Sequence, residues 1–184
     1  SYRGCSAKPP SRNNTNTNNM FDIDSIITRC KERPETLFLR DPRSPDFEEI
    51  VKGNNSLQGN IVDRQFFDYF GGTFCDAHGY DGTINGKKYE VKSTGSRMKD
   101  KDGKEGYLRI NSCNENKRGL FDYMAIVDIL HNMVFIIPHD EWYNRGHFIG
   151  KEFHWSGTYN KSDNQKRSNT RLLLEYEKYP KQAA

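Results

Sequence analysis

The stretch GYDGTINGKKYEVKS, residues 79–93, predicts a β-hairpin that carries charge on one face. Its turn is Asn85-Gly86, the dipeptide best suited to a type I′ turn, in which both central residues need positive φ. Counting outward from this turn brings Asp81 opposite Glu90. Because side chains alternate between the two faces of a strand, these two carboxylates are expected to share a face.

The two faces of this hairpin differ in chemistry. The polar face carries Asp81, Thr83, Lys88, Glu90 and Lys92, and the face expected to be buried carries Ile84, Tyr89 and Val91. Like charges directly opposite one another destabilise a strand pair, so a cation is expected between Asp81 and Glu90. Mg²⁺ suits such a pair, because it takes one or two protein carboxylates and completes its shell with water and phosphate oxygens. The alternative is a solvated surface ribbon whose charges face water.

The segment before the hairpin predicts a helix over residues 57–70, ended by Gly71-Gly72. Asp63 falls within the apolar arc of this helix, flanked by Phe67 and Phe70. An unpaired buried carboxylate is costly. Asp63 therefore either joins the cation site or stays partly exposed and bonded to nearby backbone, and both interpretations remain open.

Lys92 completes a pattern with the two carboxylates, because it follows Glu90 on the same face. Its ammonium group is expected to position or activate a metal-bound water, or to stabilise charge on a phosphate group. Asp81 and the triplet Glu90-Val91-Lys92 resemble the signature of the PD-(D/E)XK nuclease superfamily, which includes many type II restriction endonucleases. Tyr80 stands where a proline often precedes the aspartate. The resemblance covers roughly residues 57–138.

The resemblance implies a fold and a reaction. The fold is α/β, with a central mixed β-sheet flanked by helices, as in restriction endonucleases. The reaction is Mg²⁺-dependent hydrolysis of DNA phosphodiester bonds by an endonuclease, with sequence-specific double-strand cleavage, and Mn²⁺ is expected to substitute for Mg²⁺. The metal ligands implied are Asp81, Glu90 and the carbonyl of Val91, and the catalytic residues implied are Asp81, Glu90, Lys92 and Asp63. The alternatives are a homing, junction-resolving or repair nuclease of the same fold, and a catalytically inactive DNA-binding module.

Other segments alternate between helical and strand patterns, as an α/β fold requires. We expect a helix from residue 21 that stops at Pro34, a short helix before Gly53 and another short helix after Pro138. The expected strands are residues 72–78, 107–111, 121–130 and 133–138. The last two are apolar and joined by a short polar link, which indicates adjacent strands of the central sheet.

Net charge does not by itself indicate nucleic-acid binding, because the 184 residues carry a formal charge of only +3. Position is more informative, since basic and polar residues beside the hairpin and near the C-terminus are able to follow a phosphate backbone. The candidate DNA contacts are Lys88, Ser93, Arg97, Lys99, Arg109, Asn111, Lys117, Arg118, Lys166, Arg167 and Arg171. The alternative for each basic loop is an ordinary solvated loop.

We expect one domain with two appended segments. Residues 1–20 form a flexible Asn/Thr-rich arm or linker, residues 21–160 form the nuclease-like domain, and residues 161–184 form a basic C-terminal segment that could pack on the domain. The four cysteines are widely spaced, which favours reduced thiols and an intracellular location, in the cytoplasm or in the nucleoid or nucleus. The expected partners are double-stranded DNA and a second copy of the chain in a homodimer, with no membrane.

Three further patterns have competing interpretations. Cys75 and His78 have a spacing that zinc can use, but no second pair lies nearby. His131, His139 and His147 have the residue types of a ββα-metal nuclease, although their spacing fits poorly. Trp142 and Trp155 are expected to form a small second core rather than to contact DNA.

Overall fold

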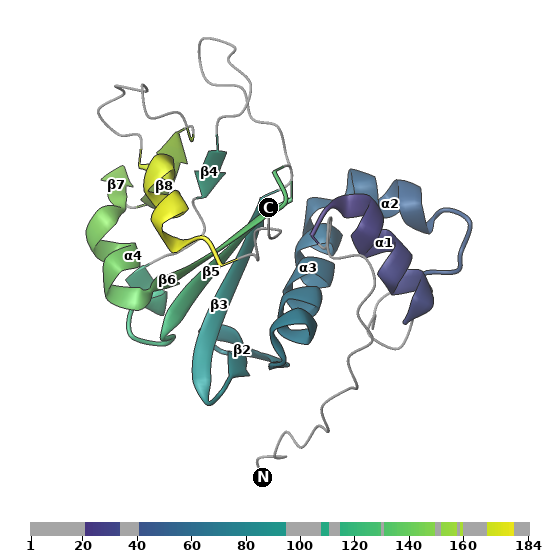
Figure 1. Cartoon of the computed structure of the whole chain (residues 1–184), viewed down its shortest axis with the longest axis horizontal. Helices are drawn as coiled ribbons and strands as arrows, with labels where there is room; N and C mark the ends of the chain where they lie inside the picture. Colours follow the sequence, from purple (N-terminus) through teal and green to yellow (C-terminus); the bar gives the residue numbers. More distant parts are fainter. Residues whose placement is uncertain are drawn as a thin grey trace, which may run out of the picture.

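The computed structural model describes residues 21–33, 41–94, 108–110, 115–129, 131–149, 152–157, 159 and 169–178. The predicted N-terminal arm, residues 1–20, lies outside these described residues. Figure 1 shows the described elements as layers on the two faces of a central sheet.

The central sheet has five strands in the order β1-β2-β3-β5-β6. These strands are β1 (Thr73–Ala77), β2 (Tyr80–Ile84), β3 (Lys87–Thr94), β5 (Tyr123–Asp128) and β6 (Met133–Pro138). Strands β3 and β5 run parallel, and every other neighbouring pair is antiparallel. The predicted α/β class with a mixed sheet flanked by helices is confirmed, whereas the likeness to restriction endonucleases stays a prediction.

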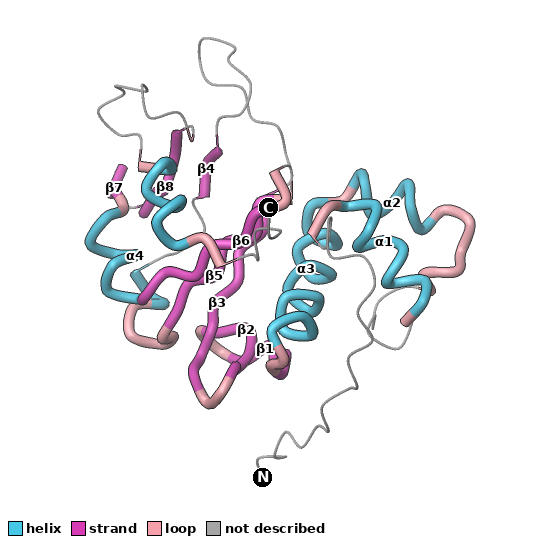
Figure 2. The backbone as a smooth tube through the Cα atoms, viewed as in Figure 1, coloured by secondary structure: helices cyan, strands magenta, loops and turns pink. Residues whose placement is uncertain are grey.

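Three helices cover one face of this sheet: α1 (Ile23–Glu32), α2 (Phe47–Gly53) and α3 (Asn55–Phe70). Asp22 caps α1, since its Oδ1 accepts a hydrogen bond from the Ser25 N–H at 3.0 Å. Helix α3 ends where predicted, at Gly71, whose φ of 71° is the left-handed conformation that glycine adopts easily. Helix α3 lies against the side of the sheet formed by β1, β2 and β3 (Figure 2).

A second layer covers the opposite face. It contains α4 (His139–Arg145), the 3₁₀ segments η2 (Glu115–Lys117) and η3 (Thr170–Tyr176), and a three-stranded sheet of β4 (Leu108–Ile110), β8 (Glu152–Gly157) and β7 (His147–Ile149). Trp142 and Trp155 are fully buried at its centre, with ring centroids 4.9 Å apart and planes 5° from parallel. The Trp155 indole N–H donates to the carbonyl of Trp142 at 3.0 Å. Both tryptophans are therefore core residues, as predicted.

The hairpin between β2 and β3 has the predicted register next to its turn, whereas the predicted pairing of Asp81 with Glu90 does not form. Ile84 pairs with Lys87, and Gly82 pairs with Tyr89. The turn residues Asn85 and Gly86 have φ of 49° and 75°, as a type I′ turn requires. Pairing with β2 stops at Tyr89, although β3 continues to Thr94 beside β5. The two strands therefore part just where their acidic residues lie.

No helix in the part of the chain that the structure describes is both long enough and apolar enough to cross a membrane.

Candidate functional site

The open end of the hairpin, formed by Asp81, Glu90 and Val91, brings two carboxyl groups to one place. The backbone of Asp81 does not pair with β3. Its side chain bonds to that strand instead. Its Oδ2 accepts a hydrogen bond from the Val91 N–H at 2.7 Å. A strand residue directs its N–H and its carbonyl to the same side, so the Val91 carbonyl faces this open end as well.

Glu90 is the most buried charged group of the site, with a side chain that is 0% exposed. Its Oε1 lies 2.6 Å from the ammonium group of Lys92 and also pairs with the ammonium group of Lys117. Its other oxygen, Oε2, is buried and has no hydrogen-bond partner among the described residues. A buried carboxylate oxygen without a partner is costly, and a cation is one group that would satisfy it.

Glu90 is buried because its side chain lies on the face of the sheet that the second layer covers. Paired residues of parallel strands share a face, and Glu90 pairs with Met124 while Lys92 pairs with Ile126. Met124 and Ile126 belong to the core of the second layer. Glu90 and Lys92 thus lie on the face that this second layer covers, whereas Val91 packs into the core beneath the helices.

Asp63 of α3 interacts electrostatically with Asp81, Glu90 and Lys92. Burial raises the pKa of the Asp63 carboxyl well above its usual range, the negative charge of Asp81 raises it further, and Lys92 partly offsets both effects. Asp63 forms no ion pair within the described ranges. Asp63 is half-buried, and its role as an additional cation ligand stays a prediction.

The pKa of Asp81 is raised as well, first by burial and then by the negative charge of Glu90. The hydrogen bond from Val91 and the charges of Lys92 and Lys117 act in the opposite direction. The site therefore holds three carboxyl groups that repel one another and two ammonium groups that compensate them in part.

Carboxylate and carbonyl oxygens are the ligands that a hard divalent cation prefers. Within the described residues, no three His, Cys, Asp or Glu side chains are arranged to surround a metal ion. Mg²⁺ does not need three, because it is commonly held by one or two carboxylates and keeps its remaining ligands as water or phosphate oxygen. Asp81, Glu90 with its unpaired Oε2, and the Val91 carbonyl would hold such an ion.

The candidate DNA contacts differ in their exposure and in the residues that they contact. Lys88 is exposed, with its ammonium group 5.1 Å from the centre of the Tyr80 ring. Arg118 pairs with Glu115 at 2.6 Å and its guanidinium group lies 4.3 Å above the Tyr143 ring. Ser93 and Arg171 are half-buried, and the backbone of Arg109 lies in β4. Arg97, Lys99, Asn111, Lys166 and Arg167 lie outside the described residues.

Lys117, one of the candidate DNA contacts, has its ammonium group paired with the buried Glu90. No local pattern reveals this contact, because the two residues are 27 positions apart. Only the fold brings η2 next to β3.

The histidines serve other roles in the structure. His139 accepts a hydrogen bond at Nε2 from the Gly119 N–H at 2.8 Å, which fixes the turn after Lys117. His131 lies 2.6 Å through Nδ1 from the buried carboxylate of Asp128. Tyr159 donates its hydroxyl to the same oxygen of Asp128 at 2.8 Å. This second polar cluster lies at the end of β5, beyond the open end of the hairpin.

Comparisons with protein-family models, with curated proteins and with solved structures find no match for this chain. The likeness to PD-(D/E)XK nucleases therefore depends on the residues of the hairpin and on their arrangement.

Proposed function

We propose that the chain is a Mg²⁺-dependent endonuclease of the PD-(D/E)XK kind that hydrolyses phosphodiester bonds in DNA. The observation that carries this proposal is the unpaired, buried Oε2 of Glu90 beside Asp81, at the end of a hairpin that also presents Lys92. A structural ion pair would not require a second carboxyl group, Asp81, whose pKa is raised by the charge of Glu90. Perturbed carboxyl pKa values with a specific charge partner are typical of functional sites.

Each side chain has a distinct task in this proposal. Asp81 and Glu90 would hold the metal ion with the Val91 carbonyl, and Asp63 would favour a cation because its carboxyl would ionise more readily once the cation is bound. The bound ion would supply Lewis acidity and lower the pKa of a coordinated water. The orientation of Asp81 is already set by its hydrogen bond to the backbone of β3.

Lys92 is suited to charge stabilisation. The Lys92 ammonium group lies 2.6 Å from Oε1 of Glu90, at the open end of the hairpin. Its charge would stabilise the negative charge that develops on the phosphate during attack by water. Its hydrogen bonds would also orient the attacking water, and the family resemblance implies products that carry 5′ phosphates.

A homodimer would suit the proposed activity. A single active site cuts one strand, so a homodimer of this chain would cut both strands of a duplex. Two-fold symmetry suits a palindromic site, and this favours a restriction endonuclease over a homing, junction-resolving or repair nuclease.

Plasmid cleavage tests the proposal. Wild-type protein is expected to convert supercoiled plasmid into discrete fragments with Mg²⁺ and to leave it intact with EDTA. Asp81→Asn and Lys92→Met should abolish cleavage. Asp68→Asn is the matched control, because Asp68 is exposed on α3 and pairs only at the surface with Arg33.

Two outcomes would contradict the proposal. Cleavage that persists in Asp81→Asn would contradict the proposed site. DNA binding by folded protein without any cleavage of plasmid or branched substrates would favour the inactive DNA-binding module.

A further inference from the structure

Lys117 occupies an unusual position for a residue of a short surface turn. It ends η2, and its side chain, which is 32% exposed, extends to the fully buried Glu90. The turn that carries it is anchored on both sides, by the Arg118 N–H to the Glu115 carbonyl at 3.0 Å and by the Gly119 N–H to His139. The backbone at Lys117 is thus fixed, while its long side chain can adopt other rotamers.

Two ammonium groups converge on the same oxygen of Glu90, Oε1, and leave Oε2 without a partner. Together they carry the same charge as one divalent cation. The lysines therefore neutralise part of the charge of Asp63, Asp81 and Glu90 in the way that a metal ion would.

On the basis of the proposed nuclease function, we propose that Lys117 is a displaceable counter-ion of the site. A divalent cation competes with Lys117 for Glu90, and the released ammonium group then binds a non-bridging oxygen of the DNA phosphate. Lys117 is thereby a phosphate-binding residue that connects metal loading to DNA binding. Its departure makes room for the phosphate at the same position.

The fold indicates which lysine leaves. Lys92 is tethered to Glu90, because it lies two positions later on the same face of β3, and its side chain is 23% exposed. Lys117 comes from a separate element and has the more exposed side chain. Rotation of its side chain toward solvent disturbs neither the strand ladder nor the hydrogen bond between Asp81 and Val91.

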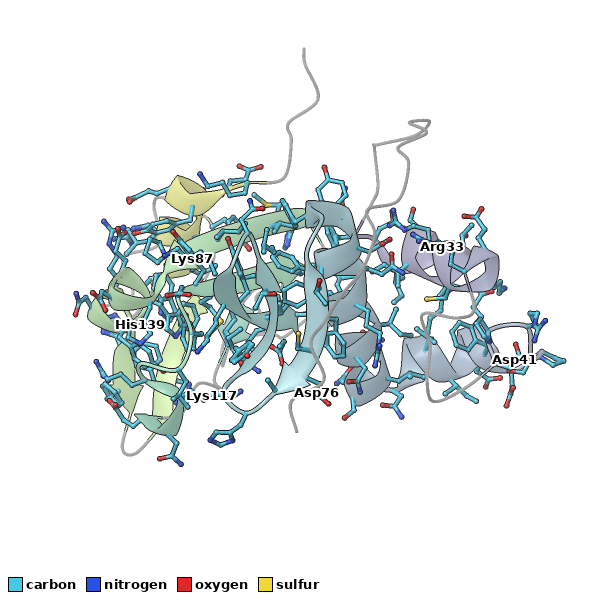
Figure 3. All side chains as sticks on the ribbon, turned by 90° about the horizontal axis from the view of Figure 1, so that it is seen from below. Arg33, Asp41, Asp76, Lys87, Lys117 and His139 are labelled. Carbon is cyan, nitrogen blue, oxygen red and sulfur yellow. The ribbon has the colours of Figure 1, made fainter. Side chains whose placement is uncertain are left out.

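Binding of Mn²⁺ alone, followed by the electron paramagnetic resonance signal of the free ion, tests the competition. Lys117→Met removes the competing charge and keeps most of the unbranched side chain, so it should tighten Mn²⁺ binding by about threefold to tenfold. Lys87→Met is the matched control, because Lys87 is exposed at the tip of the hairpin and lies apart from Lys117 (Figure 3). It should leave Mn²⁺ affinity unchanged.

Binding of a mixed-sequence duplex with Ca²⁺ tests the phosphate contact. Lys117→Met should weaken binding by about threefold to tenfold and lower the slope of log affinity against log salt by about one. Lys117→Arg should restore most of both, since it keeps the charge. Thermal unfolding of each variant establishes that the proteins compared are folded.

The outcomes separate this inference from the proposed function. If Glu90→Gln abolishes Mn²⁺ binding but Lys117→Met leaves or weakens it, the counter-ion role is overturned and the metal site stands. An unchanged salt slope in Lys117→Met would overturn the phosphate contact. If Glu90→Gln binds Mn²⁺ like the wild type, both the metal site and the role of Lys117 are wrong.

Discussion

Asp81 accepts a hydrogen bond from the backbone N–H of Val91, with 2.7 Å between Oδ2 and the nitrogen. This contact joins the first carboxylate to the strand that carries Glu90 and Lys92, where the ladder between β2 and β3 has stopped. The relative position of the two carboxylates is therefore set by the hairpin itself. A site that is preorganised in this way needs little rearrangement to hold a charged ligand.

Gly82 is important for this preorganisation, because its pair with Tyr89 is the one farthest from the turn and lies next to Asp81. A Cβ at this position would lie 2.4 Å from the Thr73 carbonyl oxygen and 2.6 Å from Cζ of Phe67. Gly82→Ala should therefore lower the free energy of unfolding by about 1–3 kcal/mol, measured by urea denaturation. Gly53→Ala is the control, since nothing lies within 4 Å of a Cβ there. Equal stability of the two variants would contradict this packing.

Asp63→Asn should make the protein more stable and less active. Burial and the charge of Asp81 raise the pKa of Asp63, so its charged form is unfavourable in the folded state at neutral pH. Asparagine does not ionise in either state and avoids this cost, so the free energy of unfolding should rise by about 0.5–2 kcal/mol at pH 7. The cleavage rate should fall, since the site loses charge that favours a cation.

The stability that Asp63→Asn gains over the wild type should increase with pH. The folded-state pKa of Asp63 lies above its unfolded value near 3.8, so the wild type loses stability as the pH rises through the folded-state pKa. The difference between the melting temperatures of Asp63→Asn and wild type should be small near pH 4 and should grow toward pH 7. A difference that shrinks with rising pH would contradict the raised pKa.

How much of this arrangement the sequence predicts depends on how local each contact is. The hairpin register and the end of α3 follow from Asn85-Gly86 and Gly71, because turn and cap chemistry act within a few residues. The strands β7 and β8 were not predicted. Nor was the pairing of Lys117 with Glu90, which depends on the packing of the second layer against β3 and β5.

The cluster at the end of β5 was missed for the same reason. Tyr159 donates to Asp128 from 31 positions away, and His131 contacts the same carboxylate from within the turn that follows. Because Asp128 is 0% exposed, its hydrogen bonds should contribute to stability more than surface contacts do. Neither partner is recognisable from the apolar pattern of the strand.

Tyr159→Phe tests that contribution. Loss of the hydroxyl leaves the buried Asp128 with one donor fewer, so the free energy of unfolding should fall by about 1.5–3 kcal/mol, the range for hydrogen bonds to charged groups. Tyr80→Phe is the control, because its ring packs beneath Lys88 and would be kept. Equal effects in urea denaturation would show that the Tyr159 hydroxyl does not stabilise the fold.

Cys30 should be protected from alkylation. It is 0% exposed, and burial raises its pKa to about 11 from a usual value of 9.0. At pH 8, native protein should react with iodoacetamide at the half-buried Cys75 before Cys30, as peptide mass spectrometry would show. Because the folded-state pKa is the higher one, Cys30 should also reduce stability as the pH rises above about 9. Faster labelling of Cys30 than of Cys75 would contradict its burial.

The most direct test of the central claim is the Mg²⁺ dependence of plasmid cleavage by wild-type protein and by Glu90→Gln. The wild type should yield discrete DNA fragments with 5′ phosphate ends, only when Mg²⁺ is present, and Glu90→Gln should yield none while it remains folded. Cleavage by wild type in EDTA, or undiminished cleavage by Glu90→Gln, would contradict a metal-dependent nuclease site at the open end of the hairpin.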